Sequence, residues 1–80
     1  MRIDKFLKVS RLVKRRPIAK EMADQGRIKV NDRVVKSSYE IKVGDVIEVG
    51  YGSRQVKARV CEVRETTKKA EASELYELID

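Results

Sequence analysis

The chain has 80 residues, and its 19 Lys and Arg against 13 Asp and Glu give a net charge of +6. This length provides one small domain with a limited core, which excludes a large catalytic cleft beside a separate binding domain, and its apolar runs fall short of the ~20 residues of a membrane span. Because the start shows no charged-then-apolar signal peptide, and because the single Cys61 has no internal disulfide partner, we expect a cytoplasmic protein without a membrane partner.

Two short helices are predicted near the start of the chain. A stripe of mostly apolar residues at helical spacing predicts a helix over residues 3–12: Ile3, Phe6, Leu7, Ser10 and Val13. Pro17 suits the first turn of a second helix, over residues 17–25, because a proline there loses no hydrogen bond. Gly26 then ends this helix, since glycine adopts the left-handed conformation at little cost.

After Gly26 the apolar period changes from helical to alternating, which predicts strands. Asn31-Asp32 is a suitable turn pair between two short strands, and residues 43–45 form another turn before a strand at residues 46–49. A loop at residues 50–53 precedes a further strand at residues 56–64, in which Cys61 is expected to be a packed thiol.

The end of the chain is predicted to be helical. Beyond a polar stretch at residues 66–69, apolar residues return at three- and four-residue steps: Ala72, Leu75, Tyr76 and Ile79. This spacing predicts a short amphipathic helix. Its other face is acidic and carries Glu71, Glu74 and Glu77.

Positive charge is concentrated in the first half of the chain. Residues 1–36 hold 12 Lys and Arg and 4 Asp and Glu, a net charge of +8, whereas residues 37–80 hold 7 and 9, a net charge of −2, and the two values add to +6. The asymmetry points to a polyanion, RNA, as the partner of the basic half. The alternative is that these cations only keep a small domain soluble.

The basic residues gather around two helix starts, where free N–H groups and the helix dipole also favour phosphate. Arginine can hold a phosphate through two parallel hydrogen bonds. The candidate RNA-binding residues are Arg2, Asp4, Lys5, Lys8, Arg11, Arg15, Arg16, Arg27 and Lys36. Asp4 is either an ordinary acid at a helix start or a partner that orients Arg11 or Arg16. Arg27 and Lys36 are either phosphate contacts or ordinary surface cations.

The chain has only four aromatic residues, which argues against recognition of single strands through several exposed rings. Phe6 belongs to the first apolar stripe and Tyr76 to the last. Tyr39 and Tyr51 lie near loops, where packing is favoured over stacking on a base. We therefore expect recognition of RNA shape and backbone.

Catalysis has little support in the sequence. There is no His, the glycines do not form a nucleotide-binding loop, and Cys/His metal ligands are absent. We therefore expect a binding protein that is not an enzyme and that carries no cofactor and no metal.

Five segments together resemble the S-four-type RNA-binding domain family: Arg2-Ile3-Asp4-Lys5-Phe6-Leu7, Ser10-Arg11, Arg16-Pro17-Ile18-Ala19, Gly26-Arg27-Ile28-Lys29-Val30-Asn31 and Val43-Gly44-Asp45-Val46-Ile47. The resemblance covers residues 1 to 49, with Asp32 at a place where glycine is common. It implies an α+β fold in which two short N-terminal helices pack on a small, mostly antiparallel sheet, with a short C-terminal helix. Residues 1–65 would form the RNA-binding domain, and residues 66–80 an acidic amphipathic helix of the same unit.

Further segments resemble the RqcP-type family of ribosome-associated quality-control factors, over nearly the whole chain: residues 4–12, 14–16, 23–28 and 65–69. The resemblance implies binding to large ribosomal subunits obstructed by peptidyl-tRNA, through large-subunit rRNA and the tRNA, with Arg2 and Arg16 as leading contacts. It also implies support of template-free alanine tailing of stalled chains, together with an RqcH-type tRNA-recruiting factor. We expect a ribosome-associated monomer. The alternative comes from a related family of small heat-shock RNA-binding proteins: a general rRNA- and tRNA-binding factor that recycles large subunits carrying nascent chains.

Overall fold

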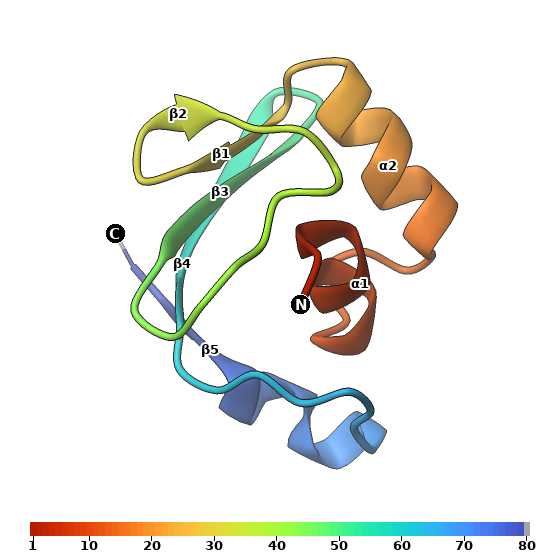
Figure 1. Ribbon diagram of the computed structural model, residues 1–80, viewed down its shortest axis with the longest axis vertical. Helices are drawn as coiled ribbons and strands as arrows, with labels where there is room; N and C mark the ends of the chain where they lie inside the picture. Colours follow the sequence, from red (N-terminus) through yellow and green to blue (C-terminus); the bar gives the residue numbers. More distant parts are fainter. Residues whose placement is uncertain (80) are drawn as a thin grey trace.

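The computed structural model describes residues 1–79, in which helices cover one face of a five-stranded antiparallel sheet (Figure 1). The helices are α1 (Ile3–Val9), α2 (Arg16–Asp24) and the 3-10 helix η1 (Lys69–Leu75). The strands are β1 (Ile28–Val30), β2 (Arg33–Val34), β3 (Val46–Tyr51), β4 (Arg54–Val60) and β5 (Tyr76–Leu78). Their order in the sheet is β2-β1-β3-β4-β5. The predicted α+β class, with two N-terminal helices and a short C-terminal one, is confirmed.

The core lies between α1, α2 and the inner face of the sheet. Helix α1 contributes Phe6, which is fully buried as predicted. Alternate residues of each long strand point to the same side, which is the reason for the period of two in the sequence. The buried strand residues are Ile28, Val30, Ile47, Val49, Ala58 and Val60.

Helix α1 ends at Val9, earlier than the predicted residue 12. The cause is Arg11, whose φ of 64° lies in the left-handed region that glycine usually occupies after a helix. The N–H of Arg11 donates to the carbonyl of Lys8 (3.1 Å), and that of Val13 donates to the carbonyl of Leu7 (3.0 Å). This reversal buries Val13 and directs the chain into α2.

Helix α2 begins and ends within one residue of its predicted bounds, 17–25. Gly26 has a φ of 75° and donates its N–H to the carbonyl of Ala23 at 3.0 Å. The N–H of Arg27 donates to the carbonyl of Met22 at 2.9 Å. These two bonds satisfy the last carbonyls of the helix, so Gly26 ends α2 as expected.

The predicted turn at Asn31-Asp32 joins β1 to β2. Both residues have positive φ, 51° and 69°, which matches the two-residue turn that fits a twisted hairpin. The Asn31 side chain also accepts the N–H of Val46 (3.0 Å) and donates to Asp45 (3.2 Å). The hairpin is thereby tied to the second predicted turn, just before β3.

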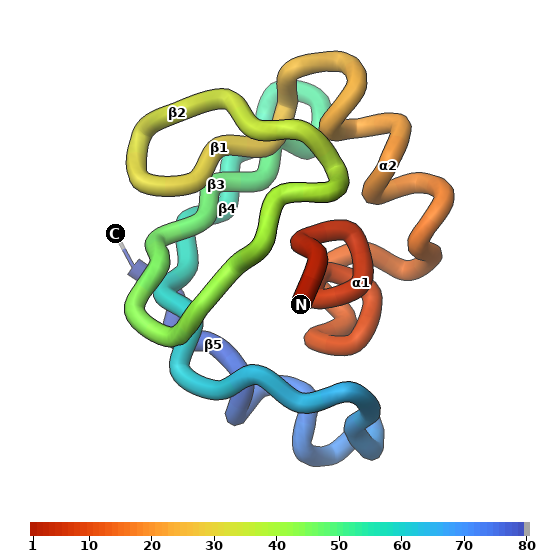
Figure 2. Tube along the Cα trace, in the orientation of Figure 1, coloured from red at the N-terminus to blue at the C-terminus, as the bar shows by residue number. Residues whose placement is uncertain are grey.

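The long connection from β2 to β3 runs beside the start of α1 (Figure 2). The N–H groups of Ile3 and Asp4 donate to the carbonyls of Tyr39 (2.7 Å) and Ser37 (3.2 Å). A further β-bridge pairs Arg2 with Glu40. This short ladder holds the first residues of the chain in place.

The last segment differs from the prediction. The expected C-terminal helix over residues 66–80 is shorter than predicted: η1 ends at Leu75 and strand β5 follows it. Asp80 lies outside the described residues. Tyr76 and Ile79 follow the helical spacing only by coincidence, because residues 76–78 form a strand that pairs with β4. The N–H of Ile79 extends this pairing by donating to the carbonyl of Lys57 at 2.8 Å.

The prediction of a strand over residues 56–64 is also corrected, because β4 ends at Val60. The N–H groups of Cys61 and Glu62 both donate to the carbonyl of Leu75, at 2.8 and 3.2 Å, so the chain leaves the sheet around η1. The prediction of a packed thiol is wrong, since Cys61 lies beyond the end of β4 and is exposed. None of the described helices is long and apolar enough to cross a membrane.

Replacement of Leu75 by alanine is expected to lower the free energy of unfolding by about 2–5 kcal/mol, because its side chain is fully buried and the change leaves a cavity. Leu78→Ala is the matched control, since Leu78 is 64% exposed, and it should change stability by less than about 0.5 kcal/mol. Chemical denaturation followed by circular dichroism measures both. Equal effects of the two variants would show that η1 is not anchored through Leu75.

Candidate nucleic-acid interface

A buried carboxylate joins two of the candidate arginines. Asp4, in the first turn of α1, is 3% exposed. Its Oδ2 contacts Nη2 of Arg2 at 3.2 Å, and its Oδ1 contacts Nη2 of Arg16 at 3.3 Å. Of the two alternatives left open by the sequence, Asp4 therefore orients arginines. Its partners are Arg2 and Arg16, and Arg11 is not one of them.

The local folding of the chain explains why these three residues meet. Arg2 is the residue before α1, and Arg16 is the first residue of α2, so the pair links the starts of both helices. Asp4 Oδ1 also accepts the N–H of Lys5 at 2.7 Å, which fixes the carboxylate. Each of the two arginine side chains is 45% exposed and uses one nitrogen on Asp4, so the remaining guanidinium donors stay available for a phosphate.

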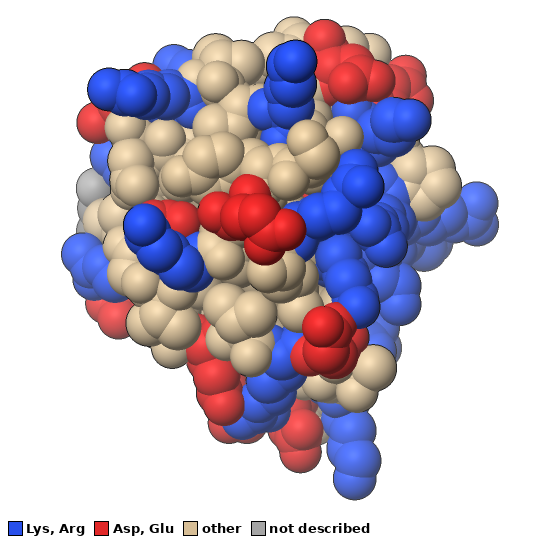
Figure 3. Space-filling view, in the orientation of Figure 1, with Lys and Arg blue, Asp and Glu red and all other residues tan. Residues whose placement is uncertain are grey.

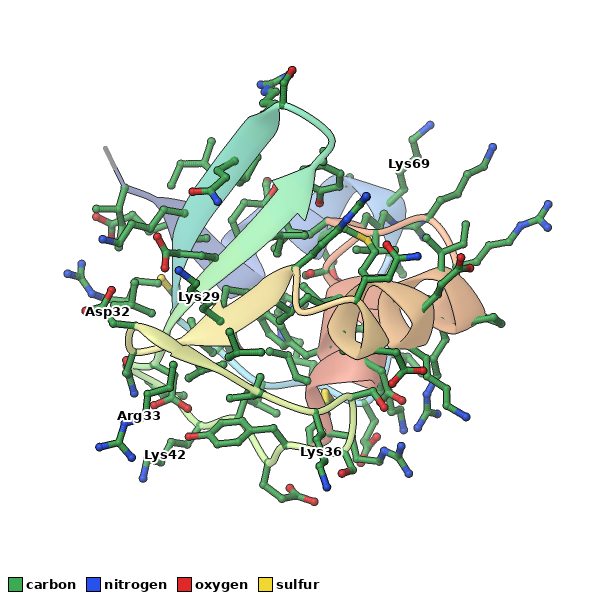
Figure 4. The ribbon with its side chains drawn as sticks, turned by 90° about the horizontal axis from the view of Figure 1, so that it is seen from above. Lys29, Asp32, Arg33, Lys36, Lys42 and Lys69 are labelled. Atoms are coloured by element: carbon green, nitrogen blue, oxygen red, sulfur yellow. The ribbon has the colours of Figure 1, made fainter. Side chains whose placement is uncertain are left out.

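Lys36 lies near one member of this pair, Arg2. A hollow of about 540 Å³ is lined by both Arg2 and Lys36. Its other lining residues are Ala23, Asp24, Val34, Val35, Ser37 and Ser38. Lys36 projects from the connection that follows β2, and Figure 4 shows its side chain pointing outward. The structure thus adds Lys36 to the cations around Arg2.

Lys8 and Arg11 lie at the opposite end of α1. They line a second hollow, of about 490 Å³, together with Lys14. Arg11 is held there by its left-handed backbone, an arrangement that is unfavourable for any residue with a Cβ. Strained residues of this kind are more frequent at functional sites than elsewhere.

Lys5 is engaged within the molecule. Its ammonium group donates to Glu65 in the segment that follows β4. This hydrogen bond, and then the charge of Lys5, lowers the pKa of the Glu65 carboxyl. The ion pair is therefore fully formed at a pH above the ordinary pKa of a glutamate. It is lost as the pH falls through the lowered pKa of Glu65. RNA would have to compete with Glu65 for Lys5.

The two remaining candidates differ in their position. Arg15 is exposed at the start of α2, directly beside Arg16. Arg27 lies beyond the other end of α2, where its carbonyl accepts the N–H of Gly50 at 2.9 Å. The structure therefore places Arg15 with the arginine pair and does not bring Arg27 to it.

Lys and Arg side chains gather over α1, α2 and their connection, along the right of the view in Figure 3. Sequence reasoning omitted two cations that line hollows on this side, Lys14 and Arg54. Lys14 could have been found, because it precedes Arg15 and Arg16 in one basic run. Arg54 could not, because only the folding of the β3–β4 hairpin brings it close to Arg11.

The S4 domain family matches residues 1–47 of the chain. The chain belongs to this family. The S4 domain therefore includes Arg2, Asp4 and Arg16 as well as the first two strands, and the predicted family resemblance is confirmed.

Two bacterial relatives match almost the whole chain. Both are named RQC P-site tRNA stabilizing factor. The relative from Bacillus subtilis is 52% identical over 99% of this chain and 92% of its own length. The relative from Streptococcus pneumoniae is 51% identical over 99% of this chain and 90% of its own length. The similarity thus extends beyond the S4 domain through η1 and β5.

A solved structure has the same fold. Heat shock protein 15 of Vibrio cholerae, described as trimeric, superposes with a TM-score of 0.92 over 99% of this chain and 81% of its own. Its sequence is 25% identical to this one. The S4 domain and the C-terminal segment are therefore arranged alike in the two proteins.

Arg11→Gly is expected to weaken RNA binding about tenfold while leaving stability equal or raising it by up to about 1 kcal/mol. The first effect follows from the loss of a charged hydrogen-bond donor, and the second from relief of the left-handed backbone. Binding of a short fluorescent RNA stem and thermal unfolding measure the two effects.

Arg11→Ala is the control, because it removes the same charge and keeps the strained backbone. It should bind RNA as weakly as the glycine variant without the gain in stability. RNA affinity of Arg11→Gly equal to that of the unchanged protein would remove Arg11 from the interface.

Proposed function

We propose that this chain is an RNA-binding factor of ribosome-associated quality control that acts without making or breaking a covalent bond. The observation that carries the proposal is the arginine pair fixed by Asp4 on an S4 domain. The relatives that match the whole chain are named RQC P-site tRNA stabilizing factor, which supports the same role.

In the finer form of the proposal, the chain binds large ribosomal subunits obstructed by peptidyl-tRNA. It contacts large-subunit rRNA and the tRNA, and it supports template-free alanine tailing of stalled chains together with an RqcH-type factor. The protein would work in the cytoplasm as a ribosome-associated monomer. The name of the relatives, which refers to a P-site tRNA, supports contact with tRNA.

The proposed RNA contacts fall into two groups at opposite ends of α1. One group surrounds Asp4 and consists of Arg2, Arg15, Arg16 and Lys36. The other group consists of Lys8, Arg11 and Lys14. The two groups meet where Lys14 and Arg15 follow one another in the chain, so they form one continuous basic surface along α1. Such a factor stabilises one tRNA state only if it binds that state more tightly than the alternatives, so phosphate affinity alone would not suffice.

A second candidate function is a general rRNA- and tRNA-binding factor of the heat-shock type. The fold shared with heat shock protein 15 over 99% of this chain favours it. The two functions differ in their dependence on the RqcH-type factor. Loss of alanine tails on stalled chains after deletion of the gene would reject the heat-shock alternative.

Co-sedimentation with isolated large subunits, small subunits and intact ribosomes tests the proposal. We expect selective binding to large subunits, increased by peptidyl-tRNA. Arg16→Ala should weaken this binding about tenfold or more, because a phosphate loses a charged partner. Arg33→Ala is the matched control, since Figure 4 shows Arg33 on the β1–β2 hairpin and pointing into solvent. It should change the affinity by less than about threefold.

Circular dichroism confirms that each variant is folded. Equal binding of the unchanged protein to all three particles, or binding to small subunits alone, would contradict the proposed role. Near-normal binding of folded Arg16→Ala would contradict the site.

A further inference from the structure

Two neighbouring hollows form one groove between the α1–α2 connection and the β3–β4 hairpin. The first, of about 490 Å³, reaches α2, and the second, of about 380 Å³, reaches β4. They share Arg11, Leu12 and Tyr51 as lining residues. We name the combined feature the Tyr51 groove.

The floor of the Tyr51 groove is apolar and its rim is basic. The floor consists of Leu12, Val13, Ile18, Met22 and Val56. Ile18 is 43% exposed, so this part of the floor is open to solvent. The rim consists of Lys8, Arg11, Lys14 and Arg54. Among the described residues that line the groove, none is acidic.

Tyr51 lines both hollows, and its side chain is held in place. Its hydroxyl donates to the carbonyl of Leu12, and its ring is half-buried against the core. Burial, and then the neighbouring Tyr76, raises the pKa of the Tyr51 phenol. The ring thus remains neutral and adds no negative charge to a basic groove. The expectation that Tyr51 packs is confirmed, but one side of it also lines the groove.

We propose that the Tyr51 groove takes a single unstacked nucleotide of the bound RNA, with the base against Tyr51 and the apolar floor and the phosphate on the rim. The inference rests on the proposed RNA-binding function and extends it from RNA backbone to one base. A rigid tyrosine beside cations is the combination by which proteins stack a base and hold its phosphate.

Charge and position favour a nucleotide over a peptide as the occupant. The charged residues of the rim are all positive, and they surround a small apolar floor. This combination matches a planar base joined to a phosphate. Lys8 and Arg11 belong both to the groove and to the proposed RNA-binding surface, so the same RNA can reach both. An acidic amphipathic peptide is the rival occupant, and the experiment below distinguishes it.

The test compares two RNA probes that differ in one base. One is a short RNA stem with a single bulged adenosine, and the other is the same stem with an abasic ribose at the bulge. Both carry the same charge, so electrostatic attraction cancels in the ratio of their affinities. The unchanged protein should bind the bulged adenosine on the order of tenfold more tightly, as a single stacked base requires. Fluorescence anisotropy measures both affinities.

Three variants locate the effect. Tyr51→Leu removes the ring, and Ile18→Gln changes an exposed position of the floor with little risk to folding. Both should reduce the tenfold ratio toward one. Tyr39→Leu is the matched control, because Tyr39 is also half-buried against the core but does not line the groove. It should leave the ratio unchanged.

The possible failures are distinguishable. If both stems bind equally to the unchanged protein, the nucleotide site is overturned while RNA binding stands, and this result would be expected from a groove that serves a peptide. If folded Tyr51→Leu and Ile18→Gln keep the ratio, the base lies elsewhere and the groove is rejected. If neither stem binds at low salt, RNA binding itself fails and the nucleotide site fails with it.

Discussion

The carboxylate of Asp4 is the interaction on which the rest of this surface depends. A buried charge is unfavourable unless it is paired, and here it is paired with Arg2 and Arg16 at 3.2 and 3.3 Å. The backbone N–H of Asp4 in turn donates a hydrogen bond to the carbonyl of Ser37, in the connection between β2 and β3. One residue therefore joins the starts of both helices to a distant part of the chain and fixes the geometry of two cations.

In the second half of the chain, acidic and basic side chains pair with one another. Arg64 contacts three carboxylates, those of Glu62 (2.9 Å), Glu71 (3.5 Å) and Glu74 (3.9 Å). Glu71 and Glu74 of η1 thus pair with Arg64 in the segment that follows β4, and they do not form a separate acidic face. With Leu75 buried beneath it, this segment leaves the positive charge concentrated on α1 and α2.

Most of the fold could be predicted because local patterns agree with it. The apolar stripes of the two N-terminal helices, Gly26 and the Asn31-Asp32 turn each have one physical interpretation, and the structure confirms the elements that they predict. The C-terminal segment could not be predicted, because Tyr76 and Ile79 satisfy a helical spacing and the strand pairing that overrides it is a tertiary effect. The early end of α1 was also hidden, since Arg11 is not a residue that normally adopts a left-handed backbone.

The sequence identified candidate residues of the site, but it did not show which of them lie together. Sequence identifies the basic half of the chain, and Asp4 was one of its candidates. Only the structure shows that Arg2 and Arg16 share Asp4, that Lys36 lies near Arg2, and that Arg27 lies apart. Those relations depend on how α1, α2 and the β2–β3 connection pack together, which residue spacing alone does not determine.

The affinity of Asp4→Asn for isolated large subunits tests the central claim most directly. The change adds one unit of positive charge, so if total charge decided binding, the variant would bind more tightly. If Asp4 positions the two arginines, the folded variant should bind about tenfold more weakly, and the same change should have no further effect in an Arg2→Ala, Arg16→Ala background. Tighter binding of Asp4→Asn would contradict the account. So would a tenfold loss of affinity from Asp4→Asn in the Arg2→Ala, Arg16→Ala background.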